Sequence, residues 1–258
     1  TSGDTGEATV TSALTFTSAN WNSAQTVTVT GADDNIIDGT QTSTVTVSIV
    51  DASSDDAFDS VPDRTVSVAT ADNDVAGFTI AQSGGSTSVA ETGTTDTFTV
   101  VLNAQPASNV VLAITSGDTG EATVTSALTF TSGNWNSAQT VTVTGVDDNL
   151  VDGTITSTIT VAVNDGSSDN NFDPVVDQTV SVTTTDNDVA GFTIAQSGGS
   201  TSVSEAGTTD TFTVVLNAQP SSDVVFSISS GDTGEVTVTG TLTFTAANWN
   251  SAQTFTLT

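Results

Sequence analysis

The chain has 258 residues and a formal charge of −29, because 30 Asp and Glu residues stand against one basic residue and no His. Cys is also absent. Without Cys and His, the usual zinc, haem and iron–sulfur sites and the nucleophiles activated by His are excluded. The lone cation, Arg64, leaves nucleic-acid binding without its electrostatic attraction. No apolar run approaches the roughly 18 residues that cross a membrane, so we expect no membrane insertion of this segment.

An internal repeat with an offset of 114 residues organises the sequence (115 − 1). The segment TSGDTGEATVTSALTFTS begins at Thr1 and again at Thr115, and a related third copy begins at Ser230. Between residues 1–114 and 115–228, 91 of 114 positions are identical. A period this long corresponds to a whole domain rather than to one coil of a solenoid.

The boundaries of the repeat are predicted by Asp-Asn-Asp-Val-Ala-Gly-Phe, which occurs at 72–78 and at 186–192. This punctuation makes residues 75–188 a complete repeat. Residues 1–74 are then the C-terminal part of one repeat, and residues 189–258 are the N-terminal part of a further one. We therefore expect the sequence to be a slice of a longer tandem array.

Alternation of apolar and hydroxyl residues, with a period of two, predicts strands throughout the repeat. Gly, Asn, Asp and Ser gather between the strands, as turn residues do. Antiparallel strands of this number and length predict an all-β fold of tandem seven-stranded, immunoglobulin-like sandwiches stacked head to tail. The predicted strands of the complete repeat lie near 77–82, 94–102, 109–115, 122–130, 139–145, 154–163 and 178–185.

An odd number of strands places alternate loops, and the end of the last strand, at one pole of the sandwich. Most acids of the repeat fall into these segments, with no base among them, so we expect them to gather at the pole that faces the next repeat. They are Glu91, Asp118, Glu121, Asp147, Asp148, Asp152, Asp186 and Asp188. The loop before the last strand adds Asp165, Asp169, Asp173 and Asp177 at the opposite pole. Asp96 belongs to neither set.

Converging carboxylates without a base repel each other, so either some stay protonated or cations bind. Oxygen ligands alone select calcium, which accepts six to eight of them in flexible geometry, over magnesium. The alternative to cation binding is that the acidic loops are simply solvated. The stretch from Asp148 to Gly153 begins like an EF-hand loop but departs from it at the third and twelfth positions.

Three stretches together resemble the Calx-β family: Val-Ala-Glu-Thr-Gly at 89–93, Asp-Asp-Asn-Leu-Val-Asp-Gly at 147–153 and Asp-Asn-Asp-Val-Ala-Gly-Phe at 186–192. The resemblance covers the whole repeat. It implies a seven-stranded sandwich that binds several calcium ions at its distal loops, as in sodium–calcium exchangers and bacterial surface adhesins. The chain departs from the family pattern in three places: Asp152 replaces a Glu, Asn187 interrupts an acidic triplet, and Thr154 and Ile155 stand where another acid is common.

The resemblance also implies a ligand set. In the complete repeat it comprises Glu91, Asp147, Asp148, Asp152, Asp186 and Asp188, with Asp118 or Glu121 as a further ligand. Their counterparts 114 residues away are Asp33, Asp34, Asp38, Asp72, Asp74 and Glu205. Acids of the opposite pole, Asp169 and Asp173 among them, are expected to meet the preceding repeat and to serve as neighbouring ligands.

The sequence therefore favours a structural protein and not an enzyme. We expect a calcium-rigidified segment of a giant secreted or cell-surface adhesin stalk or extracellular filament, of bacterial origin. Its partners are the neighbouring repeats of the same chain and, by lateral self-association, other copies. The alternative is an extracellular module that binds a glycan or a protein. In either case the Trp of each repeat (Trp21, Trp135, Trp249) is expected to close the end of the sandwich.

Overall fold

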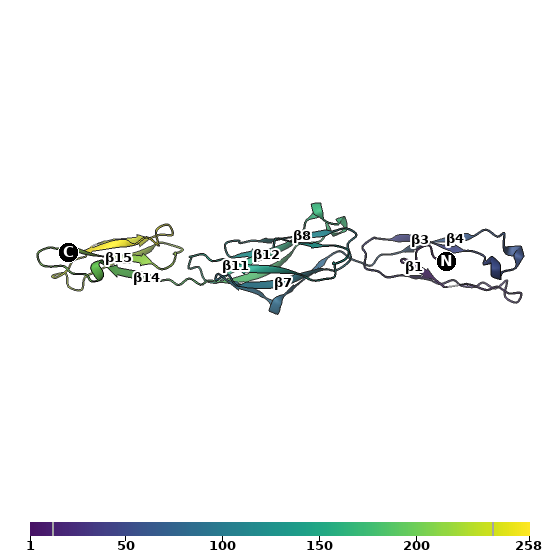
Figure 1. Cartoon of the computed structure of the whole chain (residues 1–258), viewed down its shortest axis with the longest axis horizontal. Coiled ribbons are helices and arrows are strands. Elements are labelled where there is room, and N and C mark those ends of the chain that lie inside the picture. The colour runs from purple at the N-terminus through teal and green to yellow at the C-terminus, as the bar shows by residue number, and fades with distance from the viewer. Residues whose placement is uncertain (12, 239) are drawn as a thin grey trace.

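The computed structural model describes residues 1–11, 13–238 and 240–258, and strands dominate it (Figure 1). Three groups of strands follow one another along the long axis of the molecule (Figure 1). We call them the N-terminal part (β1–β4), the central sandwich (β5–β13) and the C-terminal part (β14–β18). Within the described residues, none of the helices has the length and apolar character to span a bilayer.

The central sandwich consists of two sheets. One has the strand order β10-β8-β12-β13-β6, and the other has the order β5-β7-β11-β9. The strands are β5 (Phe78–Gln82), β6 (Thr87–Ala90), β7 (Thr95–Leu102), β8 (Val110–Ser116), β9 (Ala122–Val124), β10 (Ala127–Phe130), β11 (Gln139–Gly145), β12 (Ile155–Val163) and β13 (Gln178–Thr185). This arrangement confirms the predicted all-β sandwich.

One of the seven predicted strands is divided between the sheets, and one further strand, β6, was not predicted. The strand predicted at 122–130 is broken into β9 and β10, which pair with β11 and β8 in opposite sheets. The first predicted strand ends at Gln82, and after a short 3-10 turn the chain continues as β6 in the other sheet. The prediction of purely antiparallel strands was wrong at this point, because β6 pairs in parallel with β13.

Glycine makes the crossing from β5 to β6 feasible. Gly84 and Gly85 have φ values of 62° and 84°, in the left-handed region that other residues avoid. Asp96 on the neighbouring strand β7 fixes the crossing, since its carboxylate accepts hydrogen bonds from the Ser83 hydroxyl at 2.6 Å and from the Ser88 N–H at 2.9 Å. Asp96 thus has a structural role, because it fixes the segment that crosses from one sheet to the other. It does not belong to the acidic loops at the poles of the sandwich.

The core lies between the two sheets and consists of the inward members of the alternating strands. Val141 and Val143 of β11 are fully buried, as are Phe98 of β7 and Phe130 of β10. Trp135 packs against this core from the loop before β11, which agrees with the predicted closing role of that side chain. The outward positions carry hydroxyl side chains, for example Thr142 of β11 opposite Thr97 of β7.

The N-terminal and C-terminal parts repeat pieces of this pattern. The first contains β1 (Ala8–Val10), β2 (Val29–Gly31), β3 (Gln41–Val47) and β4 (Arg64–Thr70). The second contains β14 (Phe192–Gln196), β15 (Asp210–Leu216), β16 (Val224–Ser227), β17 (Thr241–Phe244) and β18 (Gln253–Leu257). Isolated bridges join the parts end to end, from Ile36 to Gln105 and from Leu150 to Gln219, which places the units head to tail.

Side chains that are buried in the central sandwich are exposed at the equivalent positions of the flanking parts. Phe130 is fully buried, whereas its counterpart Phe16 is 54% exposed. Likewise Val180 is 1% exposed and Val66 is 54% exposed. Because the residues are identical, the difference arises from the covering strands: β5 to β8 have no counterparts among residues 1–74.

A glycine at the end of β11 offers a test of the packing around β6. A Cβ atom at Gly145 would lie 2.1 Å from the carbonyl oxygen of Ala90, while at the counterpart Gly31 the nearest atom would be 3.7 Å away. We expect Gly145→Ala to lower the free energy of unfolding by about 1–3 kcal/mol, the usual cost of overpacking. Gly31→Ala should change it by much less. Thermal unfolding of both variants measures this, and equal losses would contradict the packing described.

Candidate metal centre

The parallel pairing of β6 with β13 is what brings the first two acids of the site together. Ala90 pairs with Thr185 at the end of both strands, and the N–H of Glu91 donates to the Thr185 carbonyl at 3.1 Å. Both strands run towards the same pole, so the residues that follow them, Glu91 and Asp186, emerge side by side. An antiparallel pair would have placed one of these residues at the opposite pole.

Two further elements reach the same pole. Gly145, the last residue of β11, pairs with Ala122, the first residue of β9. The next N–H along, that of Val146, donates to the carbonyl of Glu121 at 2.9 Å. Glu121 therefore enters the pole just before β9, and the loop from Val146 to Thr154 leaves from beside it. That loop carries Asp147, Asp148 and Asp152.

Five carboxylates form two groups that share one residue. Glu91, Asp148 and Asp188 make one group, and Glu91, Glu121 and Asp152 make the other. In each group, one oxygen atom of every member lies within 4.8 Å of those of the other members. Glu91 is only 1% exposed and Glu121 only 6%, so the shared residue lies beneath the pole surface, between the two groups.

Several oxygens of these groups are buried and lack a donor. Glu121 Oε2, Asp152 Oδ1 and Asp188 Oδ2 have no hydrogen-bond partner. The only Lys or Arg of the chain is Arg64, in β4 of the N-terminal part. A buried charge without a partner costs several kcal/mol, and a cation bound to these oxygens would offset that cost. Clustered carboxylates with no nitrogen or sulfur donor suit a hard divalent cation such as calcium.

The pKa values of four acids are raised, as expected for a cluster short of positive charge. For Glu91, Glu121, Asp152 and Asp188, burial is the largest cause of the higher pKa, and the charges of neighbouring acids add to it. Without a cation, the folded chain thus favours the protonated form of these groups more than the unfolded chain does.

Asp186 differs from its neighbours because hydrogen bonds satisfy it. Its Oδ2 accepts from the N–H groups of Asp152 at 3.1 Å and Gly153 at 2.8 Å, and its Oδ1 accepts from the N–H of Asp188 at 2.6 Å. These bonds, that from Gly153 first, lower the pKa of Asp186. Asp186 thus fastens the acidic loop to the end of β13.

Asn187 has a similar fastening role. Its side-chain amide donates to Asp147 Oδ1 at 2.7 Å, and its backbone N–H donates to Glu91 Oε2 at 3.1 Å. Asp147, one of the predicted ligands, is therefore tied to an amide and belongs to neither group of three. The amide that interrupts the acidic triplet supplies a donor that a third Asp could not.

The remaining predicted acids of the central repeat lie apart from the two groups. Asp118 is exposed, and its Oδ1 accepts from the Gly120 N–H within its own turn. Asp169 is buried, but both of its oxygens are used, by the N–H groups of Ser108 and Asn171. Asp173 is exposed at the end of a short 3-10 helix. Asp169 and Asp173 belong to neither group, and their expected role as ligands beside the preceding repeat stays a prediction.

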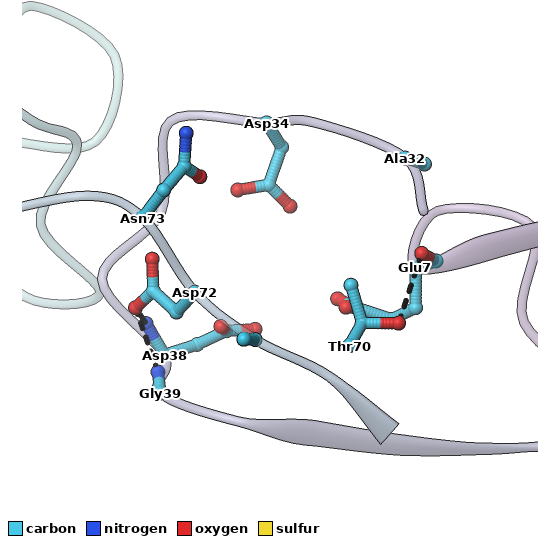
Figure 2. Close-up of a pocket in the computed structure, with 9 residues that line it drawn as sticks. Glu7, Ala32, Asp34, Asp38, Gly39, Thr70, Asp72 and Asn73 are labelled. Atoms are coloured by element: carbon cyan, nitrogen blue, oxygen red, sulfur yellow. Dashed lines mark hydrogen bonds between the residues drawn. The ribbon is translucent and has the colours of Figure 1, made fainter. Parts of the chain in front are cut away.

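The N-terminal part repeats the acidic loop and the strand end of this site without a counterpart of Glu91 among residues 1–74, and there Asp34, Asp38 and Asp72 line a small pocket (Figure 2). Asp72 Oδ2 accepts from the N–H groups of Asp38 and Gly39, as Asp186 does in the central copy. Asn73 again bonds to Asp33. Asp74 has a pKa raised by burial and then by Asp72.

Glu7 lines the same pocket (Figure 2), although the sequence analysis did not name it. It is the counterpart of Glu121, one offset of 114 residues earlier, so applying the repeat to the predicted ligand would have found it. In the C-terminal part Glu205, the counterpart of Glu91, is exposed.

No family model matches the chain, and no curated protein matches it. Among solved structures, domains 4 and 5 of the S-layer protein SbsC match with a TM-score of 0.34 and 25% identity, over 62% of each chain. The apo-form Calx CBD1 domain matches with a TM-score of 0.31 and 16% identity, over 43% of this chain and 98% of that one. The calcium binding domain CBD12 of CALX1.1 gives 0.32 and 16%, over 69% and 73%.

The two kinds of acid in the site should respond differently to loss of charge. Asp186→Asn replaces an acceptor of three backbone N–H groups, so we expect it to lower the melting temperature of the chain in chelator. Asp188→Asn removes a carboxylate whose charge is unfavourable there, so the melting temperature in chelator should stay the same or rise. Parallel thermal melts decide between them. Identical behaviour of the two variants would refute the division into fastening and ligand residues.

The raised pKa of Glu121 predicts a pH-dependent effect of Glu121→Gln. In chelator, the ionised Glu121 destabilises the fold, and this effect is absent below its usual pKa of 4.5 and grows as the pH rises through the raised value. The variant should therefore melt several degrees higher than the wild type at pH 7 in chelator and no higher at pH 4. At pH 7, calcium should raise the melting temperature of the variant less than that of the wild type.

Asp96→Asn is the matched control for Glu121→Gln. The pKa of Asp96 is lowered, chiefly by the Ser83 hydroxyl, so its ionised form stabilises the fold above the usual value of 3.8 and loses that effect as the pH falls. We expect this variant to melt at a lower temperature than the wild type at pH 7 and to show the same rise in melting temperature with calcium. A smaller rise would place Asp96 in the metal centre.

Proposed function

We propose that the chain is a structural segment of a secreted or cell-surface protein, in which bound calcium stiffens a row of sandwich repeats. Residues 75–188 are one repeat of that row, residues 1–74 are the C-terminal part of the repeat before it, and residues 189–258 are the N-terminal part of the repeat after it, as in an adhesin stalk or an extracellular filament. Calcium would be held by Glu91, Glu121, Asp148, Asp152 and Asp188 in the central repeat.

One observation carries this proposal: buried carboxylate oxygens without donors meet at one pole of the sandwich. The pole is the one from which the chain continues into the next repeat, because Asp186 and Asp188 end the last strand of the sandwich and Phe192 already belongs to β14. In the N-terminal part the corresponding acids Asp34, Asp38 and Asp72 line a pocket together with Glu7. A cation bound at such a pole would act on the connection between repeats.

The near-identity of the copies also supports a spacer. The acids of the loop at 33–39 and of the segment 72–74 after the last strand are the same in the next copy, at 147–153 and 186–188. A row that serves as a rod needs length and stiffness, and both follow from repetition of one unit. The motifs that resemble the Calx-β family point to the same cation.

Thermal melts in chelator and in millimolar calcium at equal ionic strength test the proposal. We expect calcium to raise the melting temperature, because a ligand that binds only the folded state stabilises it by about 2.7 kcal/mol per site at a hundredfold excess over its Kd. Magnesium at the same concentration should give a smaller rise. Coincident melts in chelator and calcium would overturn the proposal, and calorimetric titration would give the number of sites per repeat.

A further inference from the structure

The junction between the N-terminal part and the central sandwich is made by the acidic loop itself. The carbonyl of Asn35 accepts from the N–H of Gln105 at 2.7 Å, and Ile36 forms a parallel bridge with Gln105. The Ile37 carbonyl accepts from the Asn171 side-chain amide at 2.8 Å, and the Ile37 side chain packs against the core of the central sandwich. One short loop thus contacts two loops of the next repeat.

The second junction repeats the backbone part of this contact. The Gln219 N–H donates to the Asn149 carbonyl at 2.6 Å, and the Val151 N–H donates to the Gln219 carbonyl at 3.1 Å. The glutamine is held by its own repeat through its side chain, since Gln219 Nε2 donates to the Ala246 carbonyl and Gln105 Nε2 to that of Ser132. The receiving residue is therefore fixed before the loop of the preceding repeat reaches it.

The same loop carries the acids of the metal centre. In the central repeat, Asp148 belongs to one acidic group and Asp152 to the other. Residues Asn149 to Val151 between them make the contact with Gln219. Asp148 Oδ1 also accepts from the N–H of Leu150 at 2.6 Å, so a carboxylate of the cluster directly holds the residue that forms the bridge.

We infer that the loops at 33–39 and 147–153 are docking elements that recognise the next repeat of the same chain, with Gln105 and Gln219 as the receiving residues. Cation binding at the acids sets the shape of each loop and thereby the angle between repeats. The inference rests on the proposed function for the cation, and it adds the surface through which the cation acts. Two contacts connect the acids to the next repeat: Asp148 to Leu150, and Leu150 to Gln219.

Without the cation, repulsion between Asp148 and the other acids of its group acts on a loop that has no other charge compensation. Displacement of Asp148 moves the backbone at Leu150, because the two are hydrogen-bonded. The bridge to Gln219 is then lost or becomes variable, and the repeats sample a range of angles. With the cation, the loop has one shape and the bridge forms.

The test measures the distance across the second junction in the full chain, because both acidic groups lie in the central repeat. The protein has no Cys, so spin labels can be attached at Ser181→Cys in β13 and Thr254→Cys in β18, two exposed positions on either side of that junction. We expect a broad distance distribution in chelator and a narrow one in calcium.

Matched variants separate docking from other effects. Gln219→Pro removes the N–H that donates to the Asn149 carbonyl and leaves the acidic loop unchanged, so its distance distribution should stay broad in calcium. Gln219→Ala keeps that N–H, so its distance distribution should narrow in calcium as that of the wild type does.

The outcomes distinguish the two proposals. If the wild type neither binds calcium in calorimetry nor narrows, the proposed function fails and the docking inference fails with it. If the wild type binds calcium and its distance distribution narrows, but the distribution of Gln219→Pro narrows equally, the docking inference is overturned while the proposed function stands. Calcium binding retained in Gln219→Pro, with the narrowing lost, would establish the loop as the docking element.

Discussion

Repulsion among carboxylates held together at one pole is the constraint on which the rest of this molecule depends. The parallel pairing of β6 with β13 makes the gathering unavoidable, because it delivers Glu91 and Asp186 to the same end of the sandwich. The fold itself offsets part of the repulsion, because backbone N–H groups donate hydrogen bonds to the carboxylate of Asp186. The remaining oxygens have no such donors, and the chain has almost no basic residues with which to supply them.

The same constraint explains how charge is distributed over the sandwich. The broad outer faces carry hydroxyl pairs such as Thr158 opposite Ser181 and Thr142 opposite Thr97, while the acids lie mostly in loops and at strand ends. Hydroxyl and β-branched side chains favour a strand and add no charge to it. Asp96 is an acid within a strand, and hydrogen bonds from Ser83, Ser88 and Thr97 satisfy it. The buried carboxylate oxygens that lack such donors, on Glu121, Asp152 and Asp188, lie at the pole.

Period-two alternation was enough to predict most of the strands and, through their odd number, the pole at which the acids of the two groups gather. It did not predict β6, because Gly84 and Gly85 read equally well as an ordinary turn. Nor could it separate Asp186 from Asp188, since the roles of these two acids depend on which backbone N–H groups lie nearby. The burial of a side chain depends on strands that are still farther away in the chain. Phe16 and Phe130 occupy identical sequence contexts, and only Phe130 is covered.

Differences between the copies indicate which features of the junction are constrained. The acids of the docking loop and the receiving glutamine are the same in both copies, whereas Ile36 and Ile37 become Leu150 and Val151. Backbone hydrogen bonds make the bridge, so an exchange among aliphatic side chains leaves it intact. An exchange of Asp148 would alter both the acidic cluster and the hydrogen bond to Leu150. A residue with two such roles admits few substitutes, and this accounts for invariance in the acids beside variation in their apolar neighbours.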